Sequence, residues 1–148
     1  PHDYVKNWRE FEFLPDAIDA IRMLNKNNYK IYVITNQGGI SRGLMTEQNV
    51  NEIHNNMIEE LKKYGAKIDR IYYCPHKQGD NCECRKPNPG MLFRAASENN
   101  FDLTKAIFIG DDERDIEAGR TARCRTMLIN PENNLLKIVN SIIKPRED

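Results

Sequence analysis

The sequence predicts an α/β fold, a Rossmann-like three-layer sandwich in which helices cover both faces of a mostly parallel sheet. Short β-branched segments alternate along the chain with segments whose apolar residues recur every three or four positions. This alternation is typical of βαβ units, which set parallel strands side by side and pack the connecting helices on the sheet. With 148 residues, the chain has the size of one domain.

The first half of the chain alternates helix, strand, helix, strand. Apolar spacing predicts a helix over residues 15–28, and the β-branched run that follows predicts a buried strand at residues 31–34. Thr46 is a suitable N-cap for a second helix, which we expect to end at Gly65. A second strand is expected at residues 68–73.

The second half repeats this pattern. Residues 89–99 carry their apolar side chains on one side and predict a helix, and residues 106–109 predict a third strand. A short helix at residues 116–122 and a fourth strand at residues 125–129 follow, and a last helix is expected from Leu135 onward. In such a sheet, ligands bind beyond the carboxyl ends of the strands.

Composition and charge argue against several classes of protein. The 22 Lys and Arg residues balance the 22 Asp and Glu residues, so no overall basic field attracts nucleic acid. No apolar run approaches the ~18–20 residues that span a bilayer, and no signal-like segment opens the chain. We therefore expect a cytoplasmic protein that binds neither nucleic acid nor membranes. A monomer is a further expectation.

Three of the four cysteines lie close together and share their segment with a histidine. Cys74, His76, Cys82 and Cys84 offer three thiolates and one imidazole, a complete tetrahedral set for Zn²⁺. Because no coordination position stays open, we expect a structural zinc in the loop at residues 74–84; a surface loop with reduced thiols is the alternative. Cys124 lies apart in an apolar segment and is expected to be buried.

Groups suited to phosphate chemistry occur at three places. Thr35 follows the first strand, three aspartates within residues 111–115 follow the third, and the basic pair Arg85 and Lys86 follows the cysteine loop. A hydroxyl, a cation and hard oxygen ligands for Mg²⁺ are the components of a phosphoryl-transfer site. Each is a weak signal alone, but their joint occurrence at strand ends indicates one site around one phosphorus atom.

These residues resemble motifs of the haloacid dehalogenase superfamily of phosphatases. Residues 34–37 resemble its second motif, Lys86-Pro87 its third and residues 110–115 its fourth. The run of residues 74–87 is similar to the zinc-containing branch. That branch holds the D-glycero-D-manno-heptose 1,7-bisphosphate 7-phosphatases and the histidinol-phosphate phosphatases.

Two further segments, residues 36–43 and 86–92, look like the heptose group. The resemblance covers about residues 4–129. It implies a Mg²⁺-dependent phosphatase that removes the 7-phosphate of heptose 1,7-bisphosphate through an aspartyl-phosphate, with histidinol phosphate as the alternative substrate. Residues 1–148 would then be a single haloacid dehalogenase-like domain containing a zinc loop.

The resemblance also implies roles for individual residues. Thr35 would hydrogen-bond the transferring phosphoryl group, Lys86 would neutralise its charge, and Asp111 would bind Mg²⁺. Arg85 would help to select the substrate, and Asp112 stands in the substrate site where the heptose group often has a lysine. The other residues expected to line that site are His2, Asp3, Tyr4, Asn36, Gln37 and Gly38.

The first motif of the superfamily, Asp-x-Asp-Gly-Thr, does not occur in the sequence. Its first aspartate attacks phosphorus, and its strand would lie between those predicted at residues 31–34 and 106–109. Removing a central strand leaves buried backbone groups unpaired, at about 1–3 kcal/mol each. We therefore expect that the chain is N-terminally incomplete.

Other functions remain open on the sequence alone. A non-catalytic zinc domain that binds a phosphorylated ligand or a protein partner is the alternative if no Asp-x-Asp precedes Pro1. DNA-end phosphatase chemistry is a third possibility, and the balanced charge argues against it.

Overall fold

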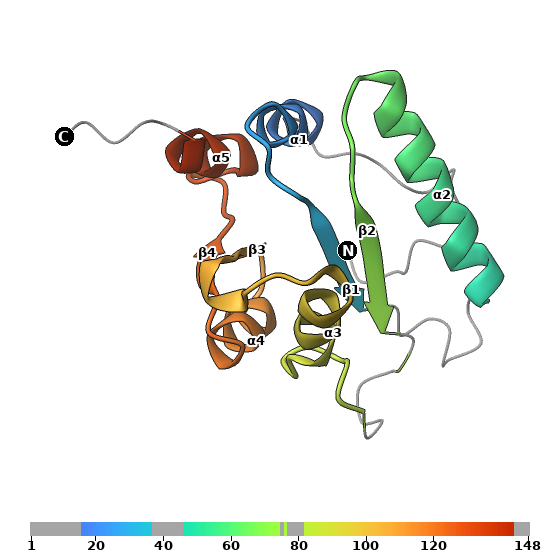
Figure 1. Ribbon diagram of the computed structural model, residues 1–148, viewed down its shortest axis with the longest axis vertical. Coiled ribbons are helices and arrows are strands. Elements are labelled where there is room, and N and C mark those ends of the chain that lie inside the picture. The colour runs from blue at the N-terminus through green and yellow to red at the C-terminus, as the bar shows by residue number, and fades with distance from the viewer. Residues whose placement is uncertain (1–15, 37–45, 75, 77–81, 144–148) are drawn as a thin grey trace.

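The computed structural model describes residues 16–36, 46–74, 76 and 82–143. Within these ranges five α-helices and four strands alternate as the sequence predicts (Figure 1). In chain order they are α1 (Ala17–Lys26), β1 (Tyr32–Asn36), α2 (Glu47–Lys63), β2 (Arg70–Cys74), α3 (Gly90–Asn99), β3 (Ile107–Gly110), α4 (Glu113–Thr121), β4 (Arg125–Leu128) and α5 (Leu135–Ile143). A 3-10 turn, η2 (Leu103–Lys105), precedes β3. Of the described helices, none combines the length and apolar character needed to cross a membrane.

Side-chain caps define where two of the helices begin. The hydroxyl of Thr46 accepts the N–H of Asn49, and the Asn49 side chain accepts the N–H of Thr46, which forms a capping box at α2. Asp112 and Asp115 form the same arrangement at α4. As a result α4 begins at Glu113, before the start expected at residue 116, because its capped first turn is polar and carries no apolar periodicity.

Both pairs of neighbouring strands are parallel, as predicted. β1 pairs with β2, which sets Thr35 opposite Tyr73, and β3 pairs with β4, which sets Gly110 opposite Leu128. Within the described residues the strands form two two-stranded sheets, and no hydrogen-bonded ladder joins β1 to β3.

Helices cover both faces of the β1–β2 pair, which gives the expected three layers. Figure 1 shows α2 on one side of this pair and α3 on the other. On the α2 side, Met57 and Leu61 pack with Ile68 and the strand side chains. On the α3 side, alternate strand residues such as Tyr72 pack against Met91. A fully buried leucine such as Leu61 stabilises the fold by roughly 1.5–3 kcal/mol.

A third cluster connects α3 with the second sheet. Leu92 of α3 packs against Ala118 and Ala122 at α4, together with Cys124. Cys124 is 8% exposed, which confirms that it is buried and separate from the other cysteines. This packing fixes the position of α4 relative to α3.

Candidate active site

A cavity of about 580 Å³ lies between β1 and β3 and is lined by residues from both strands. Its floor is apolar, with side chains of α1 and α2. Its polar lining comes from Thr35 at the end of β1, Asp111 after β3, Asp115 of α4, His54 of α2 and Lys86. Thr35, Lys86 and Asp111 therefore line one cavity, which is the arrangement that a single phosphate site requires.

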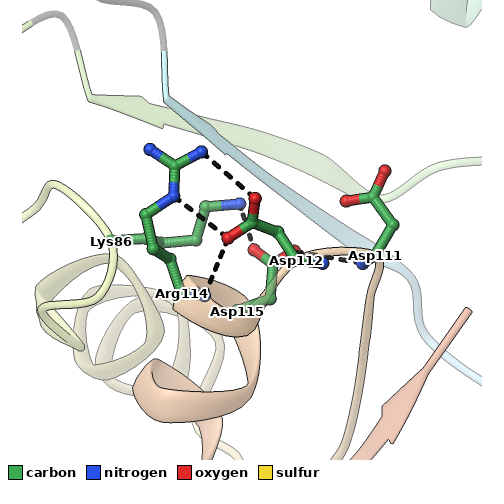
Figure 2. Close-up of polar contacts among 5 residues, drawn as sticks. All are labelled: Lys86, Asp111, Asp112, Arg114 and Asp115. Carbon is green, nitrogen blue, oxygen red and sulfur yellow. Dashed lines mark hydrogen bonds and ion pairs between the residues drawn. The ribbon is translucent and has the colours of Figure 1, made fainter.

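Asp115 organises the polar end of this cavity. One of its carboxylate oxygens pairs with the Nζ of Lys86, and the other accepts the backbone N–H groups of Asp111 at 3.1 Å and Asp112 at 3.2 Å (Figure 2). The Asp115 residue is 4% exposed, so its charge depends on these charge-assisted bonds. It thus fixes the Lys86 ammonium relative to the turn after β3.

From the sequence, Asp115 is expected only among possible Mg²⁺ ligands, and its contact with Lys86 is not predicted. Asp115 stands three residues after Asp112, which caps α4. In a capping box the side chain at this position accepts a hydrogen bond from the backbone N–H of the capping residue, so the spacing indicates that Asp115 faces the turn before the helix.

Gly110 makes room for the Asp115 carboxylate. A Cβ at position 110 would lie 2.3 Å from the Asp115 Cβ and 2.5 Å from its Oδ2. Non-bonded carbon atoms pack at about 3.5–4.0 Å, so any larger residue here displaces Asp115.

The Asp112 carboxylate forms an ion pair with the Arg114 guanidinium. Its Oδ1 accepts the Arg114 Nε–H at 3.0 Å and the Arg114 backbone N–H at 2.8 Å, and its Oδ2 accepts Nη2–H at 3.3 Å. The hydrogen bonds from Arg114 lower the pKa of the Asp112 carboxyl, and the same contact raises the pKa of Arg114. Both groups therefore stay charged near neutral pH.

The charges around the cavity do not by themselves favour an anion. The five residues of Figure 2 are two cations and three carboxylates, which leaves one net negative charge. Among the described residues, no hydrogen bond or ion pair occupies the Asp111 carboxylate, which points away from the Lys86–Asp115 pair in Figure 2. Mg²⁺ prefers one or two such carboxylates together with substrate phosphate, so a divalent cation at Asp111 would make the site attractive to phosphate.

His54 is a lining residue that no sequence motif indicated. It lies on α2 in helical spacing with Val50 and Met57, a spacing typical of core residues. Its ring meets Tyr73 edge-on with ring centroids 5.7 Å apart. Burial lowers the pKa of His54, which favours the neutral imidazole.

The cysteine cluster has the spacing of a tetrahedral metal site. The ligand atoms of Cys74, His76, Cys82 and Cys84 all lie within 4.8 Å of one another. Cys74 Sγ lies 3.7 Å from Cys82 Sγ and 3.4 Å from His76 Nδ1, which is 3.3 Å from Cys84 Sγ. Zn–S bonds of ~2.3 Å in a tetrahedron give sulfur–sulfur edges of about 3.8 Å, whereas a disulfide is about 2.05 Å long. The donor set and its spacing fit zinc.

Hydrogen bonds attach this cluster to the segment that carries Lys86. Arg85 Nη1 donates to the His76 carbonyl at 2.9 Å, and Asn88 Nδ2 donates to the Cys82 carbonyl at 2.8 Å. Arg85 is thus directed to the cysteine loop, and it is absent from the described lining of the cavity. A metal held by the cluster would brace the backbone on which Lys86 stands.

The remaining expected substrate residues lie at or beyond the edge of the described structure. Asn36 ends β1, opposite Cys74 in the strand register. His2, Asp3, Tyr4, Gln37 and Gly38 lie outside the described residues.

Known proteins resemble this chain in both sequence and structure. The polynucleotide kinase 3 phosphatase family model matches residues 2–130. The chain is 41% identical over 130 residues to a D-glycero-alpha-D-manno-heptose-1,7-bisphosphate 7-phosphatase of Campylobacter jejuni, covering 87% of this chain and 74% of that protein. It is 37% identical over 126 residues to a D-glycero-beta-D-manno-heptose-1,7-bisphosphate 7-phosphatase of Rhodopseudomonas palustris, covering 80% and 70% respectively.

A solved structure shows the same fold. The D,D-heptose 1,7-bisphosphate phosphatase of B. bronchiseptica, complexed with magnesium and phosphate, superposes with a TM-score of 0.87 at 31% identity and covers 95% of this chain and 88% of its own. The resemblance noted from the motifs is confirmed at the level of the family and the fold. The chain therefore belongs to the polynucleotide kinase 3 phosphatase family, within the haloacid dehalogenase-like phosphatases.

Proposed function

We propose that this domain removes the 7-phosphate of D-glycero-D-manno-heptose 1,7-bisphosphate. The observation that carries the proposal is the convergence of Thr35, Lys86 and Asp111 on one cavity at the strand ends. The names of the relatives support the substrate, since proteins 37–41% identical over most of the chain bear this activity in their names.

In this proposal each polar group of the cavity has one task. The Thr35 hydroxyl donates a hydrogen bond to the transferring phosphoryl group, and the Lys86 ammonium, held by Asp115, stabilises the negative charge on it. Asp111 holds Mg²⁺, which when bound would neutralise phosphate charge and orient the ester. The solved relative that contains magnesium and phosphate supports this choice of metal.

The attacking group of the proposed reaction is an aspartate on a further strand. We propose that this strand, which carries the first motif of the superfamily, lies in the cavity between β1 and β3. A carboxylate oxygen there would form a bond to phosphorus while the bond from phosphorus to the sugar oxygen breaks. The second aspartate of the motif would give its proton to that oxygen, and water would then release phosphate.

Zinc in this proposal is structural. Its four ligands leave no coordination site for substrate, and the loop that would hold it is hydrogen-bonded to the Arg85–Asn88 segment.

A substrate comparison with the full-length protein tests the proposed function. With Mg²⁺ present, we expect kcat/KM for heptose 1,7-bisphosphate to exceed that for histidinol phosphate by at least about 100-fold. Both anomers should be assayed, because the relatives' names include the alpha and the beta form. Omission of Mg²⁺ from the assay should abolish phosphate release, and Mg²⁺ added back should restore it. A preference for histidinol phosphate would refute the substrate assignment.

Gly110→Ala tests the arrangement around Asp115. The added Cβ would collide with the Asp115 side chain and move it from Lys86, so we expect kcat/KM to fall by about 100-fold or more. Gly65→Ala is the matched control, because Gly65 has a φ of +72° but open space around it. That variant should lose only about 1 kcal/mol of stability and keep its activity. Full activity in Gly110→Ala would show that Asp115 need not occupy this position.

A further inference from the structure

We propose that Arg114, held in place by Asp112, binds the second, non-reacting phosphate of the substrate. This inference rests on the proposed function, because it assigns a residue to the 1-phosphate of the bisphosphate. No motif marked Arg114 as a site residue, and the resemblance assigned no role to its position.

The first argument is that the Arg114 guanidinium is fixed in orientation. Nε–H and Nη2–H both donate to the Asp112 carboxylate, at 3.0 and 3.3 Å, so the planar group is held along one edge. Within the described residues Nη1 makes no hydrogen bond, and the Arg114 side chain is half exposed. A guanidinium that is fixed along one edge can bind phosphate oxygens with its other edge. Because the side chain is already ordered, binding costs less conformational entropy.

The second argument is the position of this pair. Figure 2 shows Arg114 and Lys86 extending to the same side of the first turn of α4. Lys86 pairs with Asp115 and Arg114 pairs with Asp112, and these two carboxylates form the capping box at the start of α4. The guanidinium is therefore in the same electrostatic cluster as the groups that would hold the reacting phosphate.

The third argument is the chemistry of the ligand. A bisphosphate carries two anionic groups at opposite ends of one sugar, and Lys86 and the Mg²⁺ ligand can serve only one of them. Asp112 and Arg114 form a net-neutral pair, but the pair presents the outer edge of the guanidinium in a fixed orientation, where it can contact a second anionic group.

Kinetics on a pair of substrates tests this assignment. The full-length wild type, Arg114→Ala, Arg114→Lys and Arg120→Ala would be assayed on heptose 1,7-bisphosphate and on heptose 7-phosphate. Arg114→Ala should lower kcat/KM for the bisphosphate by about 10- to 100-fold, mainly through KM, and lower that for the monophosphate by less than about threefold. Arg114→Lys should lose less than the alanine variant, because it keeps the charge but not the planar fork.

Arg120 is the matched control, since it is an exposed arginine at the other end of α4. Arg120→Ala should leave the ratio of the two kcat/KM values unchanged. The Asp112 cap uses the backbone N–H of residue 114, so Arg114→Ala keeps the start of α4 intact.

The possible outcomes separate the two proposals. Equal losses on both substrates in Arg114→Ala, or no loss on either, would overturn the assignment of Arg114 while the proposed function stands. Wild-type protein that releases no phosphate from the bisphosphate would overturn the proposed function itself.

Discussion

Replacing Lys86 by alanine is expected to lower kcat of the full-length protein about 1,000-fold and to leave the fold intact. The ammonium of Lys86 lies in the cavity lining and would stabilise charge that develops on the phosphoryl group, which is where single preorganised donors have their largest effects. The fold should persist because Asp115 keeps both hydrogen bonds from the backbone of the turn that precedes α4. We expect a loss of about 1–3 kcal/mol in the free energy of unfolding, measured in urea.

Lys105→Ala is the control for this experiment, because Lys105 is an exposed lysine in η2. It should match the wild type in both rate and stability. A near-normal kcat in Lys86→Ala would remove Lys86 from the mechanism. A collapse of the fold would instead show that the Lys86–Asp115 pair is primarily structural.

Loss of zinc is expected to have the second large effect. The protein purified without chelator should contain about one zinc per chain, and its removal should lower the melting temperature by more than about 10 °C. The reason is that the four ligands come together only in the folded chain, so the free energy of zinc binding contributes to the free energy of folding. Activity should stay low when excess Mg²⁺ is added back after EDTA, since the zinc loop supports the segment of Lys86.

Two cysteine variants separate zinc binding from general effects of thiol removal. Cys84→Ser removes a ligand from the cluster and should lower both zinc content and melting temperature. Cys124→Ala changes a buried cysteine outside the cluster and should leave zinc content unchanged. A protein with far less than one zinc per chain, whose melting does not respond to EDTA, would refute the metal site.

The order and type of the five described α-helices and four described strands could be predicted because these signals are local. The spacing of Val50, Ile53, Met57 and Leu61 on α2, for example, marks the face that is buried in the structure. The start of α4 was predicted too late because capping by Asp112 continues the helix through a polar turn. The parallel pairing followed from the alternation of elements, without any knowledge of the strand order.

The contacts within the site could be predicted only in part. The placement of Thr35, Lys86 and Asp111 at one cavity could be predicted, because Thr35 and Asp111 lie at strand ends and Lys86 stands in a motif. The pairing of Lys86 with Asp115, 29 residues away, depends on how α4 packs beside α3, which no local pattern encodes. His54 looked like any other residue on the inner face of α2, and its place in the cavity follows from tertiary packing alone.

The dual contact of Asp115 has a consequence for how this protein can evolve. One carboxylate serves the lysine of one motif and the backbone turn of another, so the two motifs are not independent units of change. A substitution at Lys86 leaves the turn in place, whereas a substitution at Asp115 removes both supports at once. Among homologous proteins, substitutions should therefore be less frequent at the position of Asp115 than at the position of Lys86.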